Sequence, residues 1–252
     1  MKSVVTVTDD DGRTLEIRHV DDAGQHELAE SGDTFAQVML GVSEGMKGRF
    51  EEAAKWFRAA AEAGDPEGAF RYAYMCGAGD GVPLDKAEAV AWYTKAAQNG
   101  HSGAAMNLAF LYTEGEGVPV DLEEAARWTL FAAEKGNRVA QSTAGGLYCM
   151  GRGVPVDFEK ARAWYLKAAE RGESQALRGL GVMSLKGDGA RQDDVEGLKK
   201  FILAADRDQE LVGPKDQLAD SLDEKDVLEA GRRAEEWERS HELKSDEGRS
   251  KP

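Results

Sequence analysis

The sequence predicts an all-α fold, an α-solenoid in which helix-turn-helix repeats follow one another along the chain. Two observations lead to this prediction. Tryptophans recur every 36 residues, at Trp56, Trp92, Trp128 and Trp164. Glycines, alanine pairs and Val-Pro dipeptides recur at the same interval. Because a unit of this size cannot bury an apolar face alone, neighbouring units must stack and form one continuous core.

These landmarks divide most of the chain into five repeats. We place them at 33–64, 65–100, 101–136, 137–172 and 173–208. The first repeat is four residues shorter than the others, and the missing residues fall in its central loop. The fifth repeat carries Lys200 at the tryptophan position and Ala190-Arg191 at the Val-Pro position. Polar replacements of this kind suit an outer repeat that faces water.

Each repeat is predicted to form a helix, a loop and a second helix. The loop follows the pattern Gly-x-Gly-Val-Pro-x-Asp, as in residues 79–85. Glycine ends the first helix, proline stops it from resuming, and the aspartate caps the start of the second helix. The middle of the first helix carries a small residue in every repeat, namely Gly41, Ala73, Ala109, Gly145 and Gly181. Since glycine weakens a helix, this position predicts a close approach by a neighbouring helix.

Both ends of the chain lie outside the repeats. In residues 1–32, β-branched residues on either side of Asp11-Gly12 predict a candidate β-hairpin, followed by a helix that caps the first repeat. A hairpin alone is marginal in water, so it docks on the repeats, pairs with another chain or forms transiently. Residues 209–243 are predicted to form closing helices, and residues 244–252, which are charged and small, are predicted to be disordered.

Composition narrows the classes of partner. The net charge of −15 disfavours nucleic acid and anionic membranes. No stretch approaches the ~20 apolar residues of a membrane span, and residues 1–20 lack the apolar segment of a signal peptide. We therefore expect a cytoplasmic protein. The acidic surface either serves solubility alone or favours a partner of basic or amphipathic character.

No motif for catalysis stands out. The four histidines, His19, His26, His101 and His241, are scattered without metal-ligand spacing. We find no nucleophile elbow and no phosphate-binding loop. The prediction is that the protein is not an enzyme and holds no metal and no cofactor. The only two cysteines, Cys76 and Cys149, are expected to be inert core residues, with a reactive role as the alternative.

Two stretches carry a resemblance to a known family. They are residues 105–121, AMNLAFLYTEGEGVPVD, and residues 160–172, KARAWYLKAAERG. They resemble the Sel-1-like repeat family, relatives of the tetratricopeptide repeat, and the resemblance covers about residues 33–208. It implies a right-handed superhelix that assembles other proteins. One branch of the family is secreted, binds penicillin and pairs cysteines in each repeat; that pairing is absent here, so its activity is not transferred.

The resemblance also implies that the first helices line a concave face. Aligning each first helix on its small residue predicts which side chains point inwards. The predicted partner-binding residues are Phe35, Val38, Phe70, Arg71, Tyr74, Met106, Asn107 and Phe110.

Phe70, Tyr74, Met106 and Phe110 would form an apolar patch on an acidic protein, and such patches mark binding surfaces. The alternative is that these side chains pack against a neighbouring helix. We predict a scaffold or adaptor, a monomer or weak oligomer, that binds a partner protein or peptide on this face. Replacing Phe70 and Phe110 together should then abolish binding without unfolding the protein. The alternative function is a structural protein that oligomerises through its N-terminal hairpin.

Overall fold

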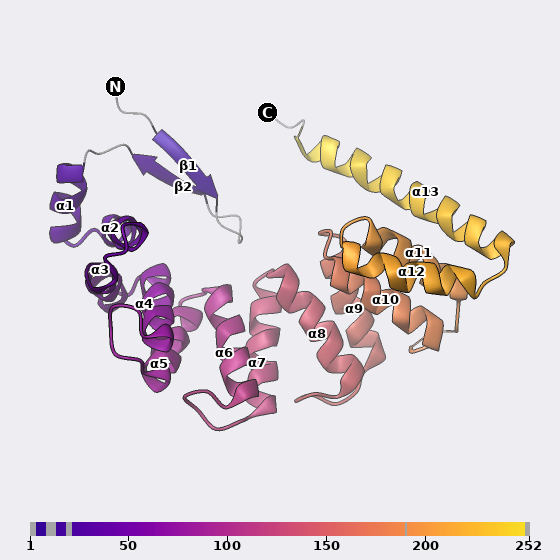
Figure 1. Ribbon diagram of the computed structural model, residues 1–252, viewed down its shortest axis with the longest axis horizontal. Coiled ribbons are helices and arrows are strands. Elements are labelled where there is room, and N and C mark those ends of the chain that lie inside the picture. The colour runs from indigo at the N-terminus through magenta and orange to yellow at the C-terminus, as the bar shows by residue number, and fades with distance from the viewer. Residues whose placement is uncertain (1–3, 9–13, 19–21, 190, 250–252) are drawn as a thin grey trace. The chain divides into compact units, whose positions relative to one another are not determined.

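A computed structural model of the chain describes residues 4–8, 14–18, 22–189 and 191–249 (Figure 1). Within these residues thirteen α-helices follow one another, packed in consecutive pairs, as predicted. The contacts divide the chain into two compact units, an N-terminal unit of residues 1–140 and a C-terminal unit of residues 141–252.

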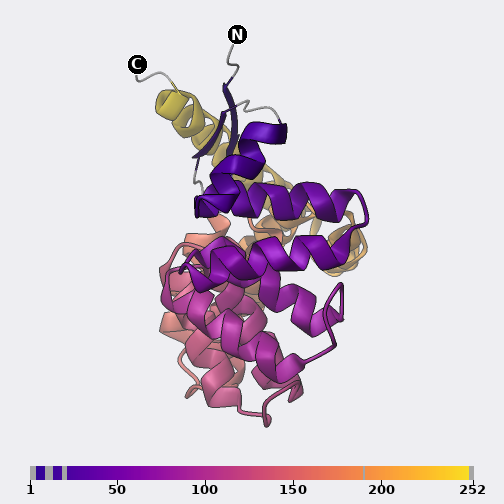
Figure 2. The same ribbon diagram turned by 90° about the vertical axis from the view of Figure 1, so that its left-hand side faces the viewer.

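The N-terminal unit stacks helix pairs in the order of the sequence. The pairs are α2 with α3, α4 with α5 and α6 with α7; α3 also packs on α4, and α5 on α6. Figure 2 faces this unit and shows the stack. Its helices are α1 (Asp22–Glu30), α2 (Thr34–Met46), α3 (Phe50–Glu62), α4 (Pro66–Ala78), α5 (Lys86–Gln98), α6 (Ser102–Glu114) and α7 (Leu122–Glu134).

Two short strands precede the helices. β1 (Val4–Thr8) and β2 (Thr14–Arg18) pair in an antiparallel sheet of two strands, with Val5 opposite Ile17. The predicted turn at Asp11-Gly12 lies outside the described residues. Because the sheet has two strands, each strand keeps one edge that is not paired within it.

The C-terminal unit continues the same packing. Here α9 packs on α10, α10 on α11, and α11 on both α12 and α13. The helices are α9 (Phe158–Ala169), α10 (Ser174–Lys186), α11 (Asp194–Ala205), the 3-10 helix η1 (Gln209–Leu211), α12 (Val212–Asp220) and α13 (Glu224–Arg249), preceded by α8 (Arg138–Met150), which begins in the first unit.

Helix α13 corrects the prediction of a disordered tail over residues 244–252. It continues to Arg249, and residues 250–252 lie outside the described part. A helix that is nucleated by a packed first half extends at little cost through helix-forming residues such as glutamate and lysine. The charge of the tail suggested disorder, but its continuity with a packed helix decides its structure.

The helix starts agree with the loop pattern. The side chains of Asp85, Asp121, Asp157 and Asp193 each accept a hydrogen bond of 2.9 Å from the backbone N–H three residues later. This is the geometry of an N-cap. The predicted starts of the second helices are therefore confirmed at α5, α7, α9 and α11.

The small residue of the first helix faces an aromatic ring of the second helix. A Cβ atom at Gly41 would lie 2.5 Å from the ring of Phe57, and a Cβ at Gly145 would lie 2.6 Å from the ring of Tyr165. The ring thus occupies the space that a side chain would need, which confirms the packing reason for these glycines. The alanine pairs are buried, whereas the tryptophans are half-buried at the edge of the core.

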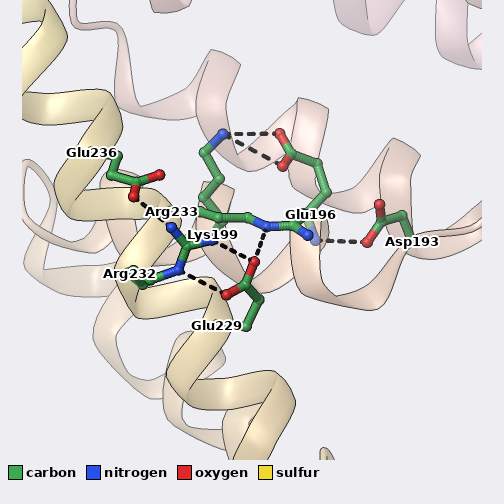
Figure 3. Close-up of polar contacts among 7 residues, drawn as sticks. All are labelled: Asp193, Glu196, Lys199, Glu229, Arg232, Arg233 and Glu236. Carbon is green, nitrogen blue, oxygen red and sulfur yellow. Dashed lines mark hydrogen bonds and ion pairs between the residues drawn. The ribbon is translucent and has the colours of Figure 1, made fainter.

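Helix α13 covers the last repeat in the C-terminal unit. Ala234 and the partly buried Trp237 join the core that includes Leu203 of α11. Figure 3 shows polar side chains of α11 and α13, among which Glu229 pairs with Arg232 and Arg233, each at 2.8 Å.

Lys200, at the tryptophan position of the fifth repeat, is not the solvent-facing residue that the sequence suggests. Its side chain is only 13% exposed and lies 3.0 Å from Glu196. Burial lowers the pKa of Lys200, and the bond with Glu196 opposes this shift. Because α11 is covered by α12 and α13, this position is internal, and the lysine is held there by an ion pair.

Candidate functional site

The N-terminal unit contains a cavity of about 360 Å³ between α2, α3 and α4, which we call the first hollow. Its wall is mainly apolar. The large apolar side chains that line it are Val42, Met46, Phe50, Phe57, Phe70, Tyr74 and Met75. The lining also contains two charged residues, Arg71 and Asp80, and the small residues Gly41, Gly45 and Ala53.

A second hollow of about 230 Å³ lies between α4, α5 and α6. Tyr74 lines it as well, so this ring stands between the two hollows. Tyr93, Phe110 and Leu111 supply further large apolar side chains to its lining. The two hollows are therefore neighbours on either side of Tyr74, and we call them together the apolar track.

Four large apolar side chains of this track are open to solvent. The exposed fractions are 86% for Met46, 46% for Phe50, 58% for Tyr74 and 57% for Phe110. A cluster of exposed aromatic and methionine side chains is unusual on a monomer surface and marks a binding surface. These exposed apolar side chains contrast with the acidic character of the chain, whose net charge is −15.

The structure brings most of the predicted binding residues together. Phe70, Arg71 and Tyr74 line the first hollow, and Tyr74, Asn107 and Phe110 line the second.

Three predicted residues do not belong to either hollow. Phe35 and Met106 are half-buried elsewhere. Val38 is 8% exposed and belongs to the core, because α2 is packed on α1, α3 and α4. The prediction of Val38 as a binding residue is therefore wrong.

Sequence reasoning missed Met46 and Phe50. They stand on either side of the short loop of the first repeat, at the end of α2 and the start of α3. A signal was available: two large apolar residues flank a loop of three polar or glycine residues, 47–49, which is too short to cover them.

Arg71 is held in place at the wall of the first hollow. Its Nε lies 2.5 Å from an oxygen of Glu67, and its guanidinium lies 5.8 Å from the centre of the Phe57 ring. Burial raises the pKa of Glu67, but the hydrogen bond from His101 and the charge of Arg71 outweigh it, so that the pKa lies below its ordinary value. Glu67 therefore stays ionised and holds the guanidinium.

The ring of Phe70 packs against aromatic side chains of the same repeat and of the next one. Its ring stacks on His101 with centroids 4.3 Å apart and lies 5.7 Å from Tyr93. His101 in turn caps α6, since its Nδ1 accepts a 3.0 Å hydrogen bond from the N–H of Ala104. Phe70 is half-buried, whereas Tyr74 and Phe110 are exposed.

The polar groups of the second hollow are paired. Lys86 Nζ lies 2.8 Å from Glu116. The hydroxyl of Tyr93 is hydrogen-bonded with Asn107, and burial raises the pKa of Tyr93 to about 12. The tyrosine is thus neutral at ordinary pH, and this hollow offers apolar surface with its charges already neutralised.

The part of the chain that the structure describes contains no group of three or more His, Cys, Asp or Glu side chains that could hold a metal ion. Cys76 is buried, and burial raises the pKa of its thiol to about 11. A thiol of this kind is protonated at neutral pH and is a poor nucleophile. Among the described helices, none combines the length and apolarity that crossing a bilayer requires.

Comparison with known proteins agrees with this architecture. The family model described as Sel1 repeat matches residues 34–65, 66–101, 102–137, 139–173 and 174–209. A search of curated proteins gave no match.

Two solved structures are similar over most of the chain. One is c5321, a protective antigen present in uropathogenic Escherichia coli strains and displaying an SLR fold, with 33% identity and a TM-score of 0.74. The match covers 87% of this chain and 49% of c5321, so the chain spans about half the length of that protein. The other is a Sel1 repeat protein from Oxalobacter formigenes, with 28% identity, a TM-score of 0.62 and coverage of 74% and 82%.

Proposed function

Since the chain belongs to the Sel1 repeat family and carries five of its repeats, we propose that it is a non-catalytic scaffold that binds a partner protein or peptide. The partner lies on the first helices of the N-terminal repeats. The observation that carries the proposal is the pair of adjacent apolar hollows on either side of Tyr74.

The chemistry of the track favours a polypeptide partner. Two hollows separated by one ring suit two apolar side chains of the same chain, one on each side of Tyr74. Aromatic side chains supply much of the binding energy at protein interfaces, because they bury a large area at a small entropic cost. Arg71 is already held by Glu67 and thus needs no reordering when a partner arrives.

The proposal includes a right-handed superhelix in which α2, α4 and α6 line the concave face. What supports it is the packing of the N-terminal unit, where α2 contacts α4 as well as α3. It also includes a cytoplasmic location, supported by two cysteines that are free, as is usual in a reducing compartment. The similarity to c5321 supports the fold but does not identify a partner.

The test replaces Tyr74 and Phe110 by alanine together. Phe70 is unsuitable for this purpose, because its ring also packs on His101 and Tyr93. The probe is a phage-displayed library of random peptides selected on the wild-type protein. We expect the enriched peptides to lose binding to the double variant, while its circular dichroism and melting temperature stay at the wild-type values.

The matched control replaces Met150 and Leu228, which are exposed apolar residues of the C-terminal unit, and it should bind the peptides as the wild type does. Equal binding by the Tyr74/Phe110 variant would overturn the proposal. So would a selection that yields no peptide dependent on these two residues.

A second candidate function rests on the hairpin. A sheet of two strands leaves backbone donors and acceptors at both edges, which can pair with another chain. A protein that begins at Ala23 lacks both strands. If oligomerisation through the hairpin is the function, light scattering will show a lower assembly mass for this variant than for the full chain; an unchanged mass refutes it.

A further inference from the structure

The loops of successive repeats dock on the preceding repeat in the same way. A Cβ atom at Gly81 would collide with the backbone of Phe50, and one at Gly117 would collide with the backbone of Lys86. Phe50 and Lys86 are the first residues of α3 and α5. Each loop is therefore fixed against the start of the second helix of the repeat before it.

In both loops an acidic residue directly precedes the docked glycine. Asp80 precedes Gly81, and Glu116 precedes Gly117. In the second hollow Glu116 meets its internal cation, Lys86, at 2.8 Å. In the first hollow the equivalent position of the helix is Phe50, which cannot neutralise Asp80.

Asp80 is consequently a half-buried carboxylate in an apolar wall. Within the described part of the chain it forms no ion pair. The cation in the same lining, Arg71, is engaged by Glu67 at 2.5 Å. A carboxylate beside apolar surface gains more from a counter-ion than one in open water, since the local dielectric is lower.

We propose that the first hollow recognises a basic side chain next to a large apolar one in the partner. The apolar side chain enters between Met46, Phe50 and Tyr74, and the arginine or lysine beside it pairs with Asp80. The partner's cation thereby supplies the charge that Lys86 supplies to Glu116. The inference rests on the proposed function, because it names the chemistry of the partner at that same site.

The difference between the two hollows determines which side chains of the partner each hollow prefers. The second hollow holds a neutralised acid and accepts an apolar group without a charge requirement. The first hollow combines apolar walls with one unpaired negative charge. A partner segment that fits both carries two apolar side chains, and only the one in the first hollow has a basic neighbour.

The experiment uses the peptides selected from the random library on the full-length protein. We expect them to carry arginine or lysine directly beside tryptophan, phenylalanine, leucine or methionine. Asp80→Asn should weaken their binding about tenfold, as expected for the loss of a charge-assisted contact. Selection on Asp80→Lys should enrich acidic residues at the same place.

Two further variants make the outcome specific. Phe50→Lys rebuilds the arrangement of Lys86 and Glu116 in the first hollow, and it should remove the preference for a basic residue although Asp80 remains. Glu123→Gln removes one negative charge from an exposed position on α7, and it should leave binding unchanged.

The two proposals fail differently. Peptides that depend on Tyr74 and Phe110 but show no basic preference, or that bind Asp80→Asn as tightly as wild type, overturn this inference and leave the scaffold function standing. A loss of binding in Glu123→Gln as large as in Asp80→Asn also overturns it, because net charge would then account for the effect. Failure to select any peptide that depends on Tyr74 and Phe110 refutes the scaffold function itself.

Discussion

Helices α4 and α10 occupy equivalent places in their repeats but present different outer faces. α4 carries Phe70 and Tyr74 where α10 carries Arg178 and Val182. Tyr74 is 58% exposed, and in the C-terminal unit the exposed residue of the pair is Arg178. The same helical scaffold thus supports an aromatic face in one unit and a polar face in the other.

Both helices also pack against an aromatic ring of the preceding repeat. Beneath α4 the ring of Phe57 lies 5.8 Å from the guanidinium of Arg71. Beneath α10 the ring of Tyr165 lies 2.5 Å from the place where a Cβ of Gly179 would be. Each ring comes from the second helix of the preceding repeat. The comparison teaches that buried rings such as Phe57 and Tyr165 and exposed rings such as Tyr74 occupy different positions of the repeat, so their substitutions should differ in their effect on stability.

The largest expected effect compares two tyrosines. Tyr165→Ala removes a ring that is 9% exposed, and it should lower the free energy of unfolding by about 3–5 kcal/mol. Tyr74→Ala removes an exposed ring and should change this free energy by less than about 0.5 kcal/mol. Urea unfolding followed by circular dichroism measures both. A similar loss for the two variants would break the distinction between inner and outer positions.

The next effect compares two glycines of the C-terminal unit. Gly179→Ala places a methyl group against the ring of Tyr165, which should destabilise the protein by about 1–3 kcal/mol. A Cβ atom at Gly231 in α13 would have no neighbouring atom within 4 Å, so Gly231→Ala should stabilise the helix by about 0.5–1 kcal/mol. Melting temperatures should therefore move in opposite directions. Shifts of the same sign would contradict the close approach at Gly179.

An intermediate case is His101, whose ring stacks on Phe70 of the proposed binding face. His101→Ala removes the N-cap of α6 and the contact with Glu67, at a cost of about 1–2 kcal/mol. His101→Asn keeps a cap acceptor but loses the ring that stacks on Phe70, and it should recover about half of that loss. Thermal unfolding of the two variants gives the difference. Equal destabilisation would mean that the cap contributes nothing.

The smallest effect is a pH dependence. The folded-state pKa of Glu67 is lowered, since the bonds to His101 and Arg71 outweigh burial. Its contribution is therefore complete above the ordinary pKa of 4.5 and is lost as the pH falls through the lower folded value. The difference in stability between wild type and Glu67→Gln should be below about 1 kcal/mol, since the side chain is one-third exposed.

The free energy of unfolding of wild type and of Glu67→Gln, measured at pH 7 and below pH 4, tests this pH dependence. The difference between the two proteins should be smaller below pH 4. Glu196→Gln provides the counterpart in the C-terminal unit, because the pKa of Glu196 is lowered by Lys200 and Lys199 against the effect of burial. A difference that grows on acidification would mean that the sign of the shift is wrong.

The repeat period made the helices and their starts predictable. A spacing that holds across four tryptophans locates the helix pairs of the repeats, and the aspartates before α5, α7, α9 and α11 have a local reason to act as caps. Gly41 and Gly145 were predictable for the same reason: a costly residue that recurs at one position indicates a close contact. Local chemistry and periodicity are both visible in a single chain.

The parts that could not be predicted depend on what covers a residue. Val38 is placed in the core by helices on several sides, and Lys200 is covered because α12 and α13 fold back on α11. Neither contact has a periodic signature. Met46 and Phe50 belong to the hollow only because the first loop is short, a departure from the repeat that alignment on its landmarks hides.

The closing helix has a consequence for lengthening the array by fusion. In the inner repeats the second helix packs on the first helix of the following repeat, as α5 does on α6, whereas α11 packs on α13 instead. Repeats joined after Arg249 would therefore meet a surface that is already occupied. Extra repeats should be inserted ahead of α10 and α11, so that the contacts of α11 with α10 and α13 are kept.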